Sequence, residues 1–364
     1  MKTKILSLVL VAGLAACSGG NPFDEGTTAE EETPGTPTDG ETIGDGEGTG
    51  INRDGIPPGT VSPSPDSSLF RAEARSESET GIDAGNGYAT GITYNSRNDT
   101  FTVDNIAFDG DRPYDRGTRV SSLNRGEFAV YEGPRTATDP VTGEEVDQFV
   151  YRAIYGVSRN RVRAADGTVT DVPTTQFAIV RTGSYIDYGF GGFIYQRDTD
   201  VSLPNSLQAR FSGKSAGLRD YAGRAGLEYS TADVTVDVDF EDFNDGESIR
   251  GDGVKGRVFN RRVIDLNGND ITAAIASTIS EDETSIPDAI FEVGPDALDN
   301  NGDLIVDIQS QSGGDVYEEG KFYAIVSGDA PDEIVGVFVL ETQGTQRTRD
   351  TGGFIVYRDP AVRP

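Results

Sequence analysis

Hydrophobic and polar residues alternate in short runs from Gly87 to the end of the chain, and Gly, Asn and Asp separate the runs. Alternation of period two, rich in Val, Ile, Phe, Tyr and Thr, is typical of β-strands with one buried face. In the clearest run four apolar residues alternate with four that are mostly acidic: Val234, Val236, Val238 and Phe240 against Thr235, Asp237, Asp239 and Glu241. Only 272–279 shows helical periodicity. The pattern predicts an all-β chain.

Shorter strands are predicted before residue 198. Residues 87–94 and 100–108 form one predicted hairpin around a turn at 95–99, and 127–131 and 148–156 form a second. Residues 175–180 follow an Asp-Gly turn as a further strand. We therefore expect a smaller β-rich domain over 80–198.

The last part of the chain, 199–364, is more regular. We predict eight strands there, near 206–217, 225–241, 248–262, 286–293, 302–310, 318–327, 332–342 and 352–358. Strands at this spacing can close a barrel through successive hairpins, and glycines within strands suit its bends. The structural alternative is a transmembrane barrel, which would place the many charged side chains of this chain in its lumen. A barrel of only eight strands has too little lumen to hold them. We therefore expect a soluble, antiparallel eight-stranded β-barrel with apolar faces inside and acidic faces in water.

A short sequence repeat separates these two regions. Residues 191–198 read GGFIYQRD and residues 352–359 read GGFIVYRD. Either two β domains end on similar strands, or two similar edge strands arose from the same packing demands. The repeat favours a domain boundary near Asp198.

Residues 17–79 differ in composition from the rest. They are rich in Gly, Thr, Pro, Ser, Asp and Glu, and residues 18–52 contain nine acidic side chains and no basic one. Such a segment buries too little apolar surface to offset the entropy of ordering it, and its like charges extend it. We predict a disordered acidic tether.

The N-terminus has the pattern of an export signal. A basic start with Lys2 and Lys4 precedes an apolar stretch over 5–14, and small residues follow. The sequence Leu14-Ala15-Ala16-Cys17 resembles the bacterial lipobox, which implies removal of 1–16 and a lipid on the Cys17 sulfur. The alternative is an ordinary secretory signal followed by a chance cysteine, but Cys17 is the only cysteine in the chain. Ser18 and Gly19 follow the cysteine, in place of an aspartate that would retain the protein at the inner membrane. By resemblance to enterobacterial sorting, this implies the outer membrane.

Composition excludes several kinds of function. After removal of 1–16 the chain has 29 basic and 61 acidic side chains, a net charge of −32, so nucleic acid is a poor partner. It has no His and no Trp, and its only Cys is Cys17. Nucleophile pairs that use His and zinc sites that use Cys or His therefore cannot form. We expect no catalytic residues, no metal and no cofactor.

Four short motifs have simpler explanations. Gly213-Lys214-Ser215 lacks the first glycine and the helix of a phosphate-binding loop. Arg250-Gly251-Asp252 is expected by chance in a chain rich in these residues. Asp237, Asp239 and Glu241 share one strand face, which is normally a solvated exterior. Residues Asp299–Asp303 predict a hairpin turn around Asn-Gly, with weak calcium binding as the alternative.

Several segments resemble the barrel of the transferrin-binding-protein-B family. They are Leu203-Pro204, Phe211-Ser212-Gly213, Gly217, Val238-Asp239-Phe240, Gly256-Arg257-Val258, Ile286-Pro287, Gly320-Lys321-Phe322-Tyr323, Ala330 and Glu333–Phe338. The resemblance implies a lipid-anchored surface protein with an eight-stranded barrel over 199–364 and a handle-like domain over 80–198. The chain is too short for the family's two full lobes, so the ligand stays unassigned.

Two functions follow as expectations. The first is a non-catalytic binding module on the outer face of the outer membrane, which binds a protein or nutrient and passes it to an outer-membrane receptor. The alternative is a structural or assembly lipoprotein of the envelope without a dedicated ligand. A carboxylate-based hydrolase ranks third, because no constellation of residues points to one.

Overall fold

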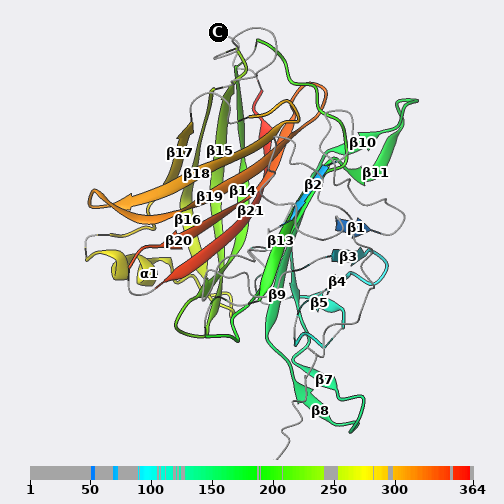
Figure 1. Cartoon of the computed structure of the whole chain (residues 1–364), viewed down its shortest axis with the longest axis vertical. Coiled ribbons are helices and arrows are strands. Elements are labelled where there is room, and N and C mark those ends of the chain that lie inside the picture. Colours follow the sequence, from blue (N-terminus) through cyan, green and yellow to red (C-terminus); the bar gives the residue numbers. More distant parts are fainter. Residues whose placement is uncertain are drawn as a thin grey trace, which may run out of the picture. The chain divides into compact units, whose positions relative to one another are not determined.

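The computed structural model describes residues 51–53, 69–72, 89, 91–104, 106, 108–110, 112–117, 120, 123, 128–186, 188, 190–206, 208–241, 253–281, 283–293, 298–344 and 347–360. Apart from one helix, the regular elements of these residues are β-strands (Figure 1). This confirms the all-β prediction.

The predicted barrel is confirmed. Its eight antiparallel strands are β14 (Gln208–Tyr221), β15 (Leu227–Asp239), β16 (Gly253–Ile264), β17 (Ala289–Val293), β18 (Asp303–Ser312), β19 (Asp315–Ser327), β20 (Glu333–Thr342) and β21 (Thr348–Arg358). Each strand pairs with the next, and β21 pairs with β14 to close the barrel. The closure is narrowest between β17 and β18, which pair at only two positions, Ala289 with Ser310 and Ile290 with Gln309.

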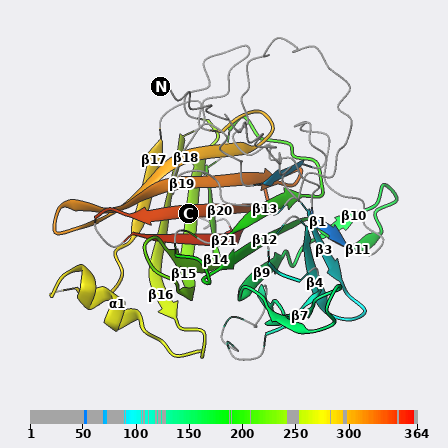
Figure 2. The ribbon, with the colours of Figure 1, turned by 60° about the horizontal axis from the view of Figure 1, so that its bottom comes forward.

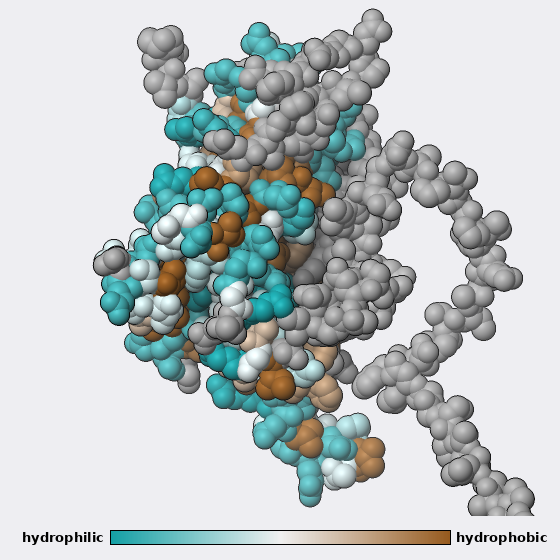
Figure 3. Space-filling view, turned by 60° about the vertical axis from the view of Figure 1, so that its left-hand side comes forward, coloured by the Kyte–Doolittle hydropathy of each residue, from teal (hydrophilic) through white to brown (hydrophobic). Residues whose placement is uncertain are grey.

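Alternation along β15 sorts apolar from polar side chains. On β15 the side chains of Val234 and Val236 are fully buried, as is Phe240 just after the strand. The intervening Asp237 lies on the outer face, where its carboxylate accepts a 2.6 Å hydrogen bond from Arg210. Hydrophilic residues predominate on the face shown in Figure 3. The predicted inward-apolar register is therefore confirmed.

The helix α1 (Thr272–Ile279) has the predicted bounds and lies beside β16 (Figure 2). Asp270 accepts the backbone N–H of Thr272 at 2.9 Å, and the Thr272 hydroxyl accepts the backbone N–H of Val263 at 2.9 Å. These contacts fix the start of the helix against the strand. No helix among the described residues is long and apolar enough to cross a membrane.

A second sheet lies before the barrel in sequence, with the order β1-β3-β4-β5-β6-β9-β12-β13-β2. Its strands are β1 (Ile51–Arg53), β2 (Leu69–Ala72), β3 (Gly91–Asn95), β4 (Thr100–Asp104), β5 (Tyr114–Arg116), β6 (Phe128–Glu132), β9 (Tyr151–Val157), β12 (Thr175–Thr182) and β13 (Gly191–Arg197). The pairs β3–β4 and β6–β9 confirm the two predicted hairpins. Two further hairpins are β7 (Thr136–Thr138) with β8 (Glu145–Asp147), and β10 (Arg161–Arg163) with β11 (Val169–Pro173).

Two short strands fall inside the range 17–79, which composition predicts to be disordered. β1 pairs with β3 and β2 pairs with β13, so these two pieces extend the sheet. Strand pairing uses backbone groups, which a composition rich in polar residues does not remove. The other residues of that range lie outside the described residues.

One face of this sheet packs on the outer wall of the barrel. Phe177, Ile179 and Phe193 of the sheet share a buried cluster with Val335 and Ile355 of the barrel. The opposite face of the sheet buries a separate cluster that includes Phe101 and Tyr131. The sheet is thus apolar on both faces, which explains why its central strands β9, β12 and β13 are buried along nearly their whole length.

The repeated segments occupy β13 and β21. β13 pairs with β12 and β2, and β21 pairs with β20 and β14, so the interpretation as edge strands is wrong. In β21 a Cβ at Gly352 would lie 2.2 Å from the ring of Phe338 inside the barrel. A Cβ at Gly353 would lie 2.1 Å from the ring of Phe177 in the sheet. The glycine pair therefore admits an aromatic ring on each side of the barrel wall.

Candidate functional site

Charged side chains fill the barrel interior near α1. We call Arg219, Arg261, Glu318 and Asp350 the barrel ion cluster; they come from β14, β16, β19 and β21 and are all at most 5% exposed. They occupy inward positions where the remainder of each strand carries apolar or small residues. A charge in such a place needs a partner, because burial removes its hydration.

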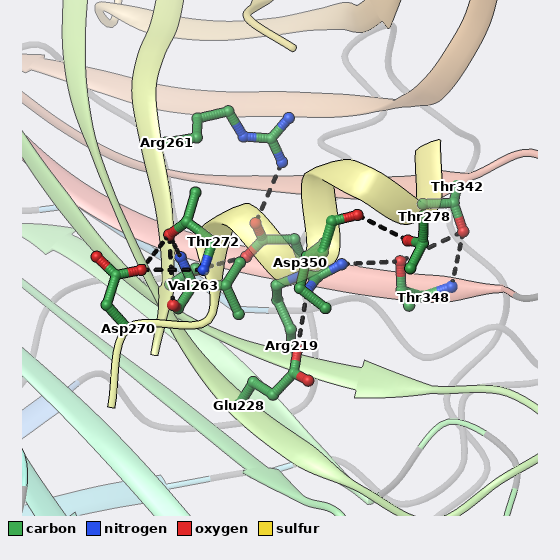
Figure 4. Close-up of polar contacts among 12 residues, drawn as sticks. Arg219, Glu228, Arg261, Val263, Asp270, Thr272, Thr278, Thr342, Thr348 and Asp350 are labelled. Atoms are coloured by element: carbon green, nitrogen blue, oxygen red, sulfur yellow. Dashed lines mark hydrogen bonds and ion pairs between the residues drawn. The ribbon is translucent and has the colours of Figure 1, made fainter. Parts of the chain in front are cut away.

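Each charge of the barrel ion cluster has a partner. Figure 4 shows Arg219, Arg261 and Asp350 of this cluster together with Glu228. Arg261 donates to Glu318 Oε1 at 3.0 Å and to Asp350 Oδ2 at 3.2 Å. Arg219 donates to Glu228 at 2.8 Å. Ser230 and Ser310 donate to Asp350 and Glu318 at 2.6 and 2.7 Å.

The pKa shifts agree with this pairing. Burial raises the pKa of Glu318, but Arg261 outweighs it and holds that pKa below its ordinary value. Burial raises the pKa of Asp350, which receives only one of the Arg261 nitrogens. Because each of these charges has an oppositely charged neighbour, with Glu228 as the partner of Arg219, we interpret the cluster as a structural ion-pair network and not as a ligand site.

A groove lies where the sheet meets the rim of the barrel, and we call it the rim groove. Its volume is about 980 Å³. It is lined by the residues before and within the β10–β11 hairpin, the connection 198–200, the β19–β20 turn and the end of β21. Its charged lining comprises Arg159, Arg161, Arg163, Arg358, Asp198, Asp200, Asp329, Asp332, Glu333 and Asp359.

Glu333 lies in the wall of the rim groove and is 1% exposed. It accepts hydrogen bonds from Ser158 Oγ at 2.6 Å, from Asn160 Nδ2 at 2.8 Å and from the Thr174 hydroxyl. These donors are neutral and all come from the sheet side, so the carboxyl joins sheet to barrel. Burial raises the pKa of Glu333, and the hydrogen bonds from Ser158 and Thr174 oppose that rise.

Both walls of the rim groove carry charged side chains. On the sheet side, the guanidinium of Arg159 stacks 3.7 Å from the ring centroid of Tyr357, whose hydroxyl accepts the Arg159 backbone N–H at 3.0 Å. On the barrel side, Asp329 and Asp332 follow β19 and are exposed. The groove lining therefore mixes charges of both signs, with Arg159 on the sheet side and Arg358 beside Asp332 on the barrel side. Such a surface can recognise a ligand with charges of both signs.

The residues singled out in the sequence have different outcomes. Leu14, Ala15, Ala16, Cys17 and Arg250–Asp252 lie outside the described residues. Asp299–Asp303 forms the predicted turn, in which Asp299 Oδ1 accepts the backbone N–H of Asn301 and of Asp303 at 2.8 Å each. Among the described residues, no group of three or more Cys, Asp or Glu side chains is arranged to hold a metal ion. Lys214 lies in a strand and pairs with Asp233 at 2.6 Å.

Sequence reasoning missed both charged features. A signal existed for Asp350, which lies on the apolar face of its strand with Phe354 and Val356. Glu333 gave no such signal, because it stands at the first position of β20 and its donors lie more than 150 residues away along the chain.

Comparison with known proteins gives only remote structural likeness. No protein-family profile and no curated protein matches the chain. Two mutants of transferrin binding protein B from Haemophilus parasuis Hp5 are similar in structure, with TM-scores of 0.34 and 0.31 and identities of 8% and 9%. They cover 73% and 60% of this chain, which spans only 44% and 39% of theirs. A third similar structure, that of a surface lipoprotein, has a TM-score of 0.29 and 7% identity. The match covers 55% of this chain and 82% of the lipoprotein chain. The structure of this chain itself contains the eight-stranded barrel and the adjacent sheet that the sequence resemblance implies.

Proposed function

We propose that this protein is a lipoprotein of the outer membrane, anchored through Cys17 and facing outside, whose folded body binds a protein or nutrient ligand without catalysis. The N-terminal sequence supports the anchor, and the acidic segment after it supports a tether. The observation that carries the binding role is the rim groove, whose lining contains exposed arginines and exposed carboxylates.

The rim groove favours binding over the structural alternative. A purely structural protein gains little from exposed charges of both signs in a groove, because exposed ion pairs add little stability. Here the wall charges Arg159, Asp329 and Asp332 are exposed, and only Glu333 is buried among its partners. The chain also lacks histidine, so the composition favours recognition over chemistry.

The anchor is tested by Cys17→Ala. We expect the variant to lose palmitate labelling and to leave the membrane fraction, because the lipid would have no attachment point. Ser18→Ala is the matched control and should stay anchored. Membrane retention of Cys17→Ala would contradict the anchor. Protease treatment of intact cells tests orientation, since a body facing outside should be degraded without lysis.

The binding role is tested by cross-linked capture from outer-membrane extracts. We expect a partner that is lost with Arg159→Ala plus Arg163→Ala, or with Asp329→Asn plus Asp332→Asn. Arg210→Ala, an exposed arginine on the barrel wall, is the control and should leave capture unchanged. No partner, or a partner that ignores both groove variants, would favour the structural alternative.

A further inference from the structure

A row of aromatic rings reaches the surface at the end of the sheet that carries the β7–β8 hairpin. The ring centroids of Phe108 and Phe149 are 4.9 Å apart, those of Phe149 and Phe190 are 6.0 Å apart, and those of Phe190 and Tyr185 are 5.4 Å apart. Ile186 follows Tyr185 in the chain. We call these five residues the aromatic face.

The aromatic face is unusually exposed for a group in which four rings contact one another in sequence. Phe108 is 57% exposed, Ile186 is 62% exposed and Tyr185 is 37% exposed, while Phe149 and Phe190 are half-buried beneath them. Single exposed apolar residues are normal on protein surfaces, whereas contiguous ones mark interaction sites. Large rigid rings are also the side chains that contribute most to protein interfaces.

The backbone holds the aromatic face in place. Phe108 has a φ of 59°, in the left-handed region that a bulky residue rarely adopts. Its carbonyl accepts the backbone N–H of Phe149 at 2.9 Å, and Ser184 Oγ accepts the backbone N–H of Val150 at 2.8 Å. The chain thus keeps a bulky residue in a disfavoured conformation while 57% of its surface stays exposed, and such outliers gather at functional sites.

An acidic hairpin stands next to this face. The β7–β8 hairpin leads directly into Phe149, and it extends beyond the end of β9 (Figure 1). Residues 139–148 carry four carboxylates, Asp139, Glu144, Glu145 and Asp147, and no basic residue. The base of the hairpin adds Arg112, which donates to Thr138 at 3.2 Å, and Arg135. The local charge is therefore negative, as is the charge of the whole chain.

We propose that the aromatic face and the β7–β8 hairpin dock a protein partner whose contact surface has an apolar pocket rimmed by lysine and arginine. Charge complementarity selects the partner, because the carboxylates repel anionic lipid headgroups and nucleic acid and attract basic side chains. The aromatic face would fill the pocket. This proposal is independent of the rim groove, which lies at other elements, so either can fail alone.

Selection from a displayed random peptide library on the purified chain tests this surface. We expect selected peptides to combine apolar residues with Lys or Arg and to bind more weakly as salt rises. Phe108→Asn plus Ile186→Ser should weaken the binding of these peptides roughly thirty-fold, which is the loss typical of an interface hot spot. Asparagine is chosen because it tolerates a positive φ.

Controls separate this surface from general stickiness and from misfolding. Ile290→Ser removes a 48% exposed apolar residue of the barrel and should leave peptide binding unchanged. Glu144→Lys plus Glu145→Lys should weaken binding while thermal melting stays unchanged. Selected peptides without basic residues, or equal binding to the Phe108 and Ile186 variant, would overturn the proposal. Binding of the face to phosphatidylglycerol vesicles, or dimerisation through it in sedimentation experiments, would also overturn it.

Discussion

The aromatic centre of the barrel offers the most direct test of its register. The ring of Phe322 on β19 is fully buried, with centroids 4.5 Å from Phe291 and 4.7 Å from Phe354. Its neighbour Lys321 points outward, where its Nζ lies 2.6 Å from Asp307 Oδ1. A shift of one residue would exchange the two positions. Phe322→Ala and Lys321→Ala therefore form a matched pair on one strand.

The expected magnitudes differ widely. Phe322→Ala removes a buried ring and leaves a cavity, which costs about 3–5 kcal/mol of unfolding free energy. Two ring contacts are lost as well, each of about 0.5–1.5 kcal/mol beyond area burial, which places the change at the upper end of that range. The Lys321 side chain is 43% exposed and its partner is 84% exposed. Loss of such a pair costs under about 1 kcal/mol.

Urea unfolding of the two variants measures this difference. The urea midpoint should fall strongly for Phe322→Ala and little for Lys321→Ala. The slope of the unfolding free energy against urea concentration should be the same for both, because it depends on the surface exposed on unfolding, which neither substitution changes much. Equal destabilisation, or a larger loss for Lys321→Ala, would refute the inward position of Phe322 and with it the register of β19.

Two further changes are predicted. The pKa of Glu333 is raised by burial, so the wild-type protein should gain thermal stability relative to Glu333→Gln as the pH falls from 7 toward about 4.3, the ordinary glutamate value. A gap between the melting temperatures that does not change with pH would contradict the raised pKa. Phe240→Ala should cost about 3–5 kcal/mol in thermal or urea unfolding, whereas Asp237→Ser on the outer face should stay within about 1 kcal/mol. A larger loss of stability for Asp237→Ser than for Phe240→Ala would contradict the inward position of Phe240 and with it the register of β15.

Much of the fold could be predicted from the sequence because one physical rule governs it locally. A strand with one face in the core and one in water must alternate, so Val234, Val236 and Phe240 reveal the inner face of β15 without any tertiary information. The same rule marked the eight barrel strands and two hairpins. Helical periodicity likewise gave the bounds of α1.

The second sheet, which contains β9, β12 and β13, shows where this rule no longer predicts the packing. Phe177 and Ile179 pack on the barrel while Ala178 and Val180 pack on the other side, so β12 is apolar throughout and its pattern does not say which partner each face meets. The pairing of β1 and β2 uses backbone groups, which leave no mark in composition.

From the sequence alone we predicted the strands, the apolar barrel interior, the excluded chemistries and the lipid anchor at Cys17. The two proposed binding surfaces could be found only from the way the elements pack in space. Glu333 meets Ser158 and Thr174 because β20 and the end of β9 converge, and Phe108 meets Phe149 because two loops share one end of the sheet. Such contacts join residues that are far apart in the chain. Their side chains carry no periodic pattern, since the positions are set by how the sheet and barrel pack and not by the local alternation of the strands.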